Sequence, residues 1–257
     1  MVSKSRPTAG RARLRDRGVS TRVPFSTYGT RLPGSPVESL KGTLIVIEGA
    51  DGSGRTTECD LLREYLEVQG RAVLETGLRR SSLVSEQIDQ AKKGNLLGAT
   101  TMALIYAVDF ADQLENKIIP ALSAGYVVLA DRYIFTLMAR AIVRGAEKAW
   151  AMKLYEFALR PNLTLFLDTR TDILMHRAFS RYQSLDYWES GMDMGISTDR
   201  FESFDKYQKL LKEQFDWMAE EYHFVRINAN RSPEEVHRDV RTSVQGLFDG
   251  IRLESFR

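Results

Sequence analysis

The stretch IEGADGSGRTT, from Ile47 to Thr57, decides the fold of this chain. It has the spacing Gly-x-x-x-x-Gly-basic-Thr of a phosphate-binding loop, with Arg55 where such loops nearly always carry lysine. The apolar run TLIVIEG precedes it as a buried strand, and the amphipathic run TTECDLLREYLEVQG follows it as a helix. In that context, backbone N–H groups and the positive end of the helix dipole converge on phosphate oxygens. The stretch therefore predicts a nucleotide-binding strand, loop and helix.

Two side chains of the loop bear on its chemistry. Thr56 is placed to ligate Mg²⁺ through its hydroxyl group. Arg55 keeps the charge of the usual lysine, but its planar fork is larger and bonds bidentately. Nucleotide binding is therefore expected to survive the change. Whether the loop is a working phosphoryl-transfer site or a nucleotide-binding relic is left open by this residue alone.

Composition sets further bounds. The 257 residues suffice for one α/β domain, and the net charge of +2 predicts no global attraction to nucleic acid. No apolar run approaches the ~18 residues that cross a bilayer, so no membrane partner is expected. The single cysteine, Cys59, excludes an internal disulfide and a Cys-rich zinc site. These features indicate a protein of the cytoplasm.

The N-terminal residues 1–40 differ in charge from the rest of the chain. They hold eight Lys or Arg residues against Asp16 and Glu38, a local charge of +6, which leaves −4 for residues 41–257. Because the segment has no apolar periodicity, we expect a disordered basic arm before a domain that spans residues 41–257. Its Arg- and Ser-rich composition also fits an organelle transit peptide.

From residue 42 onward, short apolar runs alternate with longer amphipathic ones. The expected strands are Thr43–Ile47, Ala72–Glu75, Tyr126–Ala130, Leu163–Asp168 and Phe224–Ile227. The expected helices are Thr56–Gln69, Leu83–Lys93, Thr100–Ser123, Ala146–Leu159, Thr171–Arg181, Phe201–Tyr222 and Pro233–Phe248. Near-continuous apolar strands are typical of parallel sheets covered on both faces. The pattern predicts an α/β fold with a doubly wound parallel sheet, whose ligands lie at the carboxyl ends of the strands.

A second cluster of polar residues follows the third expected strand. The run VVLADRY places Asp131, Arg132 and Tyr133 at the carboxyl end of that strand, facing the phosphate loop. The carboxylate is suited to Mg²⁺ and the arginine to an acceptor phosphate. A structural Asp–Arg pair at a strand end is the competing interpretation.

At this point the sequence resembles the thymidylate kinase family of nucleoside monophosphate kinases, from about Thr43 to Phe248. The matching pieces are IEGADGSGRTT, RRSSLVSEQI, LIYAVDFADQLENKIIPALSAGYVVLADRYIF and LTLFLDTRTDILMHRAFSR. The resemblance implies a P-loop fold with a five-stranded sheet in the order 2-3-1-4-5 and a homodimer. It also implies ATP and Mg²⁺ as cofactors and a nucleoside monophosphate as acceptor.

The resemblance also implies a role for each matching residue. ATP would be held by Gly49, Gly52, Ser53, Gly54, Arg55, Thr56 and Thr57, and the metal by Thr56 and Asp131. The acceptor would be held by Asp51 at its sugar, Arg80 and Arg132 at its phosphate, and Tyr106 under its base, with Phe110 and Tyr133 nearby. Catalysis would rest on Arg55, Asp131, Arg132, Arg177 and Arg181, the last two in a mobile lid.

The lid and the base-reading positions depart from the family pattern. An insertion with Tyr187 and Trp188 lengthens the lid, which we place at about residues 177–200. A solvated basic face is the competing interpretation of Arg177 and Arg181, which are four residues apart. Phe110 replaces an arginine that in the family reads the thymine edge, and Arg140 adds a charge where the base would lie. The phosphate machinery is therefore largely present, whereas the base-reading machinery is changed.

The leading hypothesis is ATP-dependent phosphorylation of a nucleoside monophosphate, with dTMP converted to dTDP. Two alternatives remain open from the sequence. A non-catalytic nucleotide-binding regulator is favoured by Arg55 and the changed base readers, and a kinase for another small acceptor is favoured by Arg140.

Overall fold

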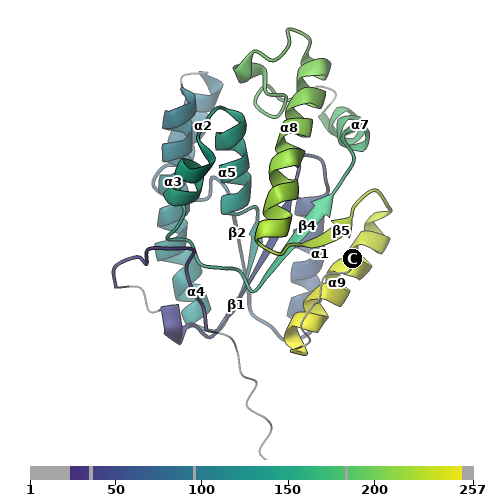
Figure 1. Cartoon of the computed structure of the whole chain (residues 1–257). Coiled ribbons are helices and arrows are strands. Elements are labelled where there is room, and N and C mark those ends of the chain that lie inside the picture. The colour runs from purple at the N-terminus through teal and green to yellow at the C-terminus, as the bar shows by residue number, and fades with distance from the viewer. Residues whose placement is uncertain (1–23, 35–36, 95–96, 183–184, 251–257) are drawn as a thin grey trace, which may run out of the picture.

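The computed structural model describes residues 24–34, 37–94, 97–182 and 185–250, with the backbone alone at 178–179 and 181–182. Within these ranges five strands form one parallel sheet in the order β2-β3-β1-β4-β5 (Figure 1). The strands are β1 (Thr43–Gly49), β2 (Val73–Gly77), β3 (Val127–Asp131), β4 (Leu163–Asp168) and β5 (Val225–Asn228). The sequence-based fold class, the strand order and each of the five expected strands are confirmed.

Alternation of side chains along β1 builds two hydrophobic cores. Leu44 and Val46 belong to the core under α3 (Ala99–Gln113), α5 (Ile134–Val143) and α8 (Arg200–Glu221). Ile45 and Ile47 point to the opposite face, under α1 (Arg55–Val68) and α9 (Pro233–Phe248). Both faces of the sheet are therefore covered, which explains why the inner strands β1, β3 and β4 are largely buried and apolar, whereas the edge strands β2 and β5 are buried only in part.

The remaining helices are α2 (Ser85–Lys93), α4 (Ile119–Ser123), α6 (Lys148–Leu154) and α7 (Thr171–Tyr182). The helix expected over Thr100–Ser123 is one continuous run, but it passes through a π-helical segment at Leu114–Ile118 before α4. Pro120 lies just beyond and has no backbone N–H to donate to the preceding turn. α6 is shorter than the predicted Ala146–Leu159, and α5 was not predicted.

Residues 24–34 and 37–40 correct the expected domain boundary. Phe25 and Val37 are buried, and Tyr28 packs its ring edge-on against Phe135 and Tyr222. Backbone hydrogen bonds join residues 26–29 to residues 156–160. The described part of the predicted arm, residues 24–34 and 37–40, therefore belongs to the domain, whereas residues 1–23 lie outside the described residues.

The insertion after α7 is anchored to the domain. Asp193, in a short 3-10 helix (Met192–Met194), accepts two hydrogen bonds from Arg144 at the end of α5, at 2.7 and 3.0 Å. Gly191 has φ 65°, and a Cβ there would lie 2.7 Å from the ring of Tyr207 on α8. A side chain at position 191 would therefore displace the insertion from α8.

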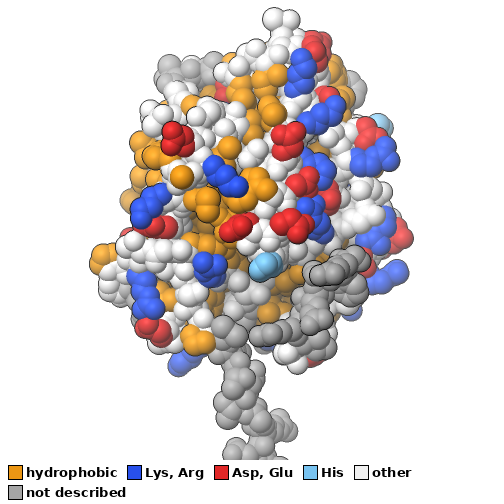
Figure 2. All heavy atoms as spheres, in the orientation of Figure 1, with side chains coloured by type: hydrophobic (Ala, Val, Ile, Leu, Met, Phe, Trp, Pro, Cys, Tyr) orange, Lys and Arg blue, Asp and Glu red, His pale blue; other side chains and the backbone are white. Residues whose placement is uncertain are grey.

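The surface differs between the two sides of the view in Figure 2. Hydrophobic side chains are exposed toward the α3 side, where Leu104 and Val108 are 46% and 48% exposed. Charged side chains of both signs gather over α8 and α9 (Figure 2). No helix among the described residues is long and apolar enough to cross a bilayer.

Candidate active site

A cavity of about 590 Å³ opens at the carboxyl ends of β1, β2 and β3. The phosphate loop forms its floor and the segment Ala229–Val236 forms one end. Helices α3 and α5 and the insertion form the other end. It is lined by most of the predicted site residues, namely Asp51, Gly52, Ser53, Gly54, Arg55, Thr56, Thr57, Arg80, Tyr106, Asp131, Arg132 and Arg177. Gly49 ends β1 directly beneath the loop.

The loop has the backbone that its glycines predict. Gly52 and Gly54 have φ of 85° and 99°, in the left-handed region that glycine adopts without strain. The N-cap of α1 is Gly54, and its side-chain-free position makes no capping bond. The first N–H groups of α1 are therefore free of a side-chain cap at the floor of the cavity, as a phosphate site requires.

Arg55 is buried and engaged by protein groups. Its Nε donates to Asp131 Oδ1 at 3.0 Å, and one terminal nitrogen donates to the carbonyl oxygens of Gly49 and Ala50. A second nitrogen lies 3.6 Å from Asp51 Oδ1. The guanidinium therefore ties the phosphate loop to the end of β3, a set of contacts for which the single ammonium of lysine has too few directions.

The two predicted metal ligands lie together. The Thr56 hydroxyl donates to Asp131 Oδ2 at 3.0 Å. A hydroxyl and a carboxylate oxygen at this distance form the kind of oxygen pair that Mg²⁺ prefers. Among the described residues there is no cluster of three or more His, Cys, Asp or Glu side chains suited to a metal. This geometry fits an ion held by few protein oxygens and completed by substrate phosphates.

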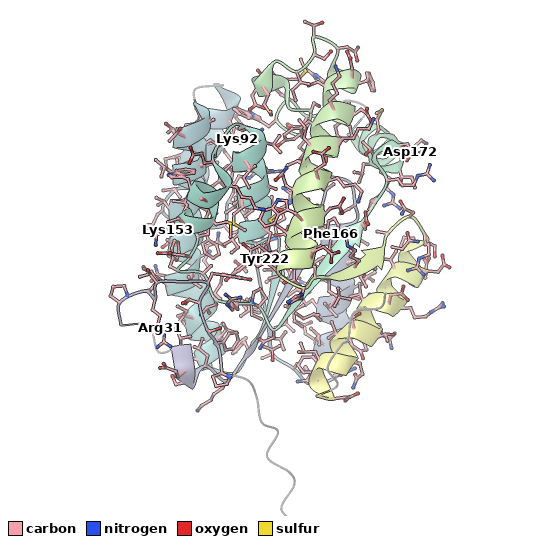
Figure 3. All side chains as sticks on the ribbon, in the orientation of Figure 1. Arg31, Lys92, Lys153, Phe166, Asp172 and Tyr222 are labelled. Carbon is pink, nitrogen blue, oxygen red and sulfur yellow. The ribbon has the colours of Figure 1, made fainter. Side chains whose placement is uncertain are left out.

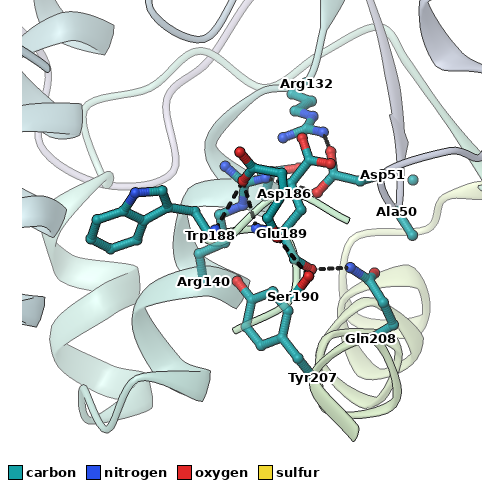
Figure 4. A network of polar contacts seen from close by, with 12 residues as sticks. Ala50, Asp51, Arg132, Arg140, Asp186, Trp188, Glu189, Ser190, Tyr207 and Gln208 are labelled. Carbon is teal, nitrogen blue, oxygen red and sulfur yellow. Dashed lines mark hydrogen bonds and ion pairs between the residues drawn. The ribbon is translucent and has the colours of Figure 1, made fainter. Parts of the chain in front are cut away.

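Asp51 joins two arginines in the half of the cavity lined by Arg80, Tyr106 and Arg132, where the acceptor is expected and which we call the acceptor half. It accepts hydrogen bonds from Arg132 and, at 3.0 Å, from Arg140 (Figure 4). Arg132 has φ 74°, a left-handed conformation that turns its side chain from the end of β3 toward the loop. Burial, with a smaller effect of Arg140, lowers the pKa of Arg132 to about 9, so the guanidinium stays charged at neutral pH. Arg140, noted from the sequence as an added charge, is thus part of the site.

Glu48 positions the turn that carries Arg132. Its fully buried carboxylate accepts from the backbone N–H groups of Tyr133 (2.8 Å) and Thr136 (3.2 Å), and from the Thr136 hydroxyl at 2.6 Å. Burial raises the pKa of Glu48. The acidic residue just before Gly49 was the only sequence signal for this role, and the sequence interpretation missed it.

Asp109 holds the backbone of the segment that carries Arg80, as Glu48 holds the turn that carries Arg132. It accepts from the backbone N–H groups of Arg79 at 2.8 Å and Ser81 at 2.9 Å. Arg79 has φ 58°, a strained conformation that these bonds support. Tyr106, one turn before Asp109 on α3, is 5% exposed and lines the cavity, as predicted for a ring under the base.

Phe110 and Tyr133 do not lie where the sequence placed them. Both are buried in the core outside the cavity wall, with ring centroids 5.0 Å apart. The Tyr133 hydroxyl donates to the carbonyl of Leu159 at 3.0 Å, and Phe110 also packs against Tyr155. The expectation that these two side chains contact the acceptor is therefore wrong, because neighbouring aromatic rings fill the space on that face of α3.

The lid is described in part. Arg177 donates to the backbone carbonyls of Ser53 (3.4 Å) and Ala229 (3.1 Å), beside the phosphate loop. Arg181 lies on α7, but its side chain is outside the described residues. The insertion adds Trp188 and Glu189 to the cavity wall, and the Glu189 carboxylate acts electrostatically on Arg132. The sequence interpretation gave Glu189 and Lys92 of α2 no role, because neither belongs to a motif.

A family model described as thymidylate kinase matches residues 47–240. The chain belongs to the thymidylate kinase family. It is 36% identical over 211 residues to a "Probable thymidylate kinase 2" of Saccharolobus solfataricus, with 82% of this chain and 99% of the relative covered. It is 31% identical over 219 residues to a "Probable thymidylate kinase" of Pyrococcus abyssi, covering 82% and 100%. A "Thymidylate kinase" of Halothermothrix orenii is 29% identical over 215 residues, covering 81% and 99%. The family resemblance inferred from the sequence is confirmed.

Proposed function

We propose that this member of the thymidylate kinase family transfers the γ-phosphoryl group of ATP to dTMP and forms dTDP. The observation that carries the proposal is the single cavity that holds the phosphate loop, the Thr56–Asp131 pair and the Arg132–Asp51–Arg140 cluster. A donor site, a metal site and an acceptor phosphate site within one cavity are the parts that phosphoryl transfer requires.

The donor half holds ATP through the loop. Backbone N–H groups of the loop and of the first turn of α1 bind the phosphates, and Arg55 and Arg177 neutralise their charge. Thr56 and Asp131 would hold Mg²⁺, which would supply further neutralisation of phosphate charge. Arg181 is assigned to the same task through its place on α7.

The acceptor half positions dTMP. Arg132 and Arg80 bind the acceptor phosphate, Asp51 binds the sugar, and the base lies on the ring of Tyr106. Acceptor phosphate binding draws Arg132 from Asp51, because a phosphate carries more charge than a carboxylate. The phosphoryl group passes directly from ATP to dTMP with no covalent enzyme intermediate, and the rate acceleration comes from positioning and charge neutralisation.

The oligomeric state and the location also stay proposals. Leu104 and Val108 lie four residues apart on α3, so they share one exposed apolar face. We assign this face to a homodimer, which sedimentation velocity of the wild type and of a Leu104→Lys variant tests. A shift of the variant to the monomer is expected, and a wild-type monomer contradicts the assignment. A cytoplasmic location and the absence of nucleic-acid partners stay predictions from composition.

The function is tested by ADP release from Mg·ATP across a panel of nucleoside monophosphates. We expect turnover with dTMP. Tight ATP binding without turnover on any acceptor would instead support the nucleotide-binding regulator, which the engagement of Arg55 by Asp131 and two carbonyls favours. Turnover only with acceptors that are not nucleotides would support a kinase for another small acceptor.

A further inference from the structure

Lys92 lines the acceptor half of the cavity, and no carboxylate of the described residues pairs with its ammonium group. It lies near the end of α2 and is half-buried (Figure 3). Neighbouring cations of the wall have carboxylate partners, as Arg79 has Asp89 and Arg140 has Asp51. In the described part of the chain, no carboxylate forms an ion pair with Lys92. Burying an ammonium without a partner costs free energy, so the wall holds a donor that a ligand atom would satisfy.

The insertion holds Lys92 in place. The indole Nε1 of Trp188 donates to the backbone carbonyl of Lys92 at 3.1 Å, and the Lys92 ammonium lies 5.8 Å from the centroid of that ring. Trp188 is itself fixed, because Asp186 Oδ1 accepts from the backbone N–H groups of Trp188 (2.9 Å) and Glu189 (3.0 Å) (Figure 4). The position of the ammonium is therefore set by a rigid neighbour that is 8% exposed.

Lys92 shares its part of the cavity with Tyr106. Both residues line the cavity, Lys92 from α2 and Tyr106 from the adjacent helix α3, and the charges of Arg140 and Arg79 act on both. The lining also includes the apolar residues Met102, Ala103 and Leu137. Its Arg140 and Arg144 are already paired with Asp51 and Asp193. A planar base on the Tyr106 ring would therefore meet few polar groups that are free to bond its edge.

Phe110, which lies in the core, supplies no donor to such a base. A lysine ammonium has three donors and no acceptor. Thymine and uracil carry a carbonyl oxygen at position 4, which accepts a hydrogen bond, whereas cytosine carries an amino group, which donates one. An ammonium at this edge would therefore attract the first two bases and repel the third.

Resting on the proposed function, we propose that Lys92 is a specificity-determining residue that donates to the 4-carbonyl oxygen of the acceptor pyrimidine and rejects its 4-amino counterpart. Trp188 is the positioning residue that keeps the ammonium at the base edge. The discrimination is between dTMP or dUMP on one side and dCMP on the other, and Lys92 does not sense the 5-methyl group.

The test is equilibrium binding of dTMP, dUMP and dCMP by calorimetry, which needs no turnover. In Lys92→Met the affinity for dTMP and dUMP should fall about 10- to 100-fold, the range for a hydrogen bond from a charged donor, while that for dCMP stays the same or rises. Lys93→Met is the matched control, because Lys93 is the next residue of α2 and is exposed. Trp188→Phe should change the three affinities in the same direction by a smaller factor.

A pH series adds a second readout. Burial, with smaller effects of Arg140 and Arg79, lowers the pKa of Lys92 to about 8, while Asp186 and Glu189 act in the opposite direction. Because the charged ammonium is a stronger donor to the base oxygen than the neutral amine, wild-type affinity for dTMP should fall between pH 7 and pH 9. That component of the fall should be absent from Lys92→Met, in which the other four charged groups are unchanged.

Three outcomes would overturn the proposal. The first is an equal loss of affinity for all three nucleotides in Lys92→Met, which would assign Lys92 to the phosphate. The second is no loss of affinity in that variant, and the third is no binding of dTMP by the wild type. Failure of the proposed function is a separate result. A protein that binds dTMP over dCMP through Lys92 but releases no ADP would retain this inference and lose the catalytic one.

Discussion

Replacement of Arg55 probes the feature that separates this chain from an ordinary phosphate loop. Its guanidinium is 7% exposed and bonds Asp131 and the carbonyls of Gly49 and Ala50. In Arg55→Ala the loop loses these bonds. The Asp131 side chain, which is 16% exposed, then keeps only its hydrogen bond from the Thr56 hydroxyl. Breaking a largely buried pair in this way costs about 3 kcal/mol of folding stability.

The catalytic effect is expected to exceed that of a merely structural change. Loss of a cation at the transferred phosphate costs on the order of a hundredfold or more in kcat, about 3 kcal/mol of transition-state stabilisation. Arg55→Lys restores a charge that reaches phosphate but cannot bond Asp131 and both carbonyls together, so it should keep a measurable fraction of turnover or exceed the wild type. Steady-state ADP release at saturating ATP and dTMP measures kcat, and thermal unfolding measures stability separately.

A suitable control for the same helix is Arg63→Lys. Arg63 is 38% exposed and lies near Asp60 and Glu75, away from the cavity. Its replacement should leave kcat unchanged and shift stability by less than ~1 kcal/mol. Unchanged turnover in Arg55→Ala would refute the reasoning, because Arg55 would then have no part in catalysis and the loop would carry out transfer without it.

Three further predictions concern stability and the corrected residues. Tyr28→Ala should lower the free energy of unfolding by about 2–3 kcal/mol and the melting temperature by roughly 5–10 °C. Arg31→Ala on the same segment, where the side chain is 54% exposed, should change both quantities little. Equal melting temperatures of the two variants would show that residues 24–34 do not contribute to the folded domain. Burial raises the pKa of Glu58 to about 7, so the folded protein holds more protons than the unfolded chain between about pH 4.5 and 7, and stability contributed by this group is lost as pH rises through that window. Chemical unfolding of Glu58→Gln should lack that loss, and an identical pH profile would exclude it. Phe110→Leu should cost about 1–2 kcal/mol in thermal unfolding and leave the ratio of kcat/KM for dTMP and dUMP unchanged, while a shift of that ratio by tenfold would place Phe110 at the base after all.

Periodicity and local motifs were sufficient to predict the sheet and the donor half of the site. The strands are short runs rich in apolar residues that alternate with helical patterns along the chain, and the loop is a contiguous motif. Helix α5 was missed because Ile134–Ala139 and Ala141 are all buried. A short and largely apolar run of this kind cannot be told from a buried strand by sequence periodicity alone.

The packed N-terminal segment and the acceptor wall could not be predicted for different reasons. Phe25, Tyr28 and Val37 are isolated anchors at irregular spacing, which composition averages away. Phe110 is aligned with a base reader, but alignment does not show that neighbouring rings have filled its side of α3. Lys92 belongs to no motif, and only the fold brings it to the cavity wall.

The most direct test of the central claim is transfer of a radiolabelled γ-phosphoryl group from ATP to dTMP by the wild-type chain. The account predicts labelled dTDP, formed in the presence of Mg²⁺ and abolished by a chelator, with a rate that falls on the order of a hundredfold in Arg55→Ala. Binding of ATP and dTMP with no labelled dTDP would contradict it.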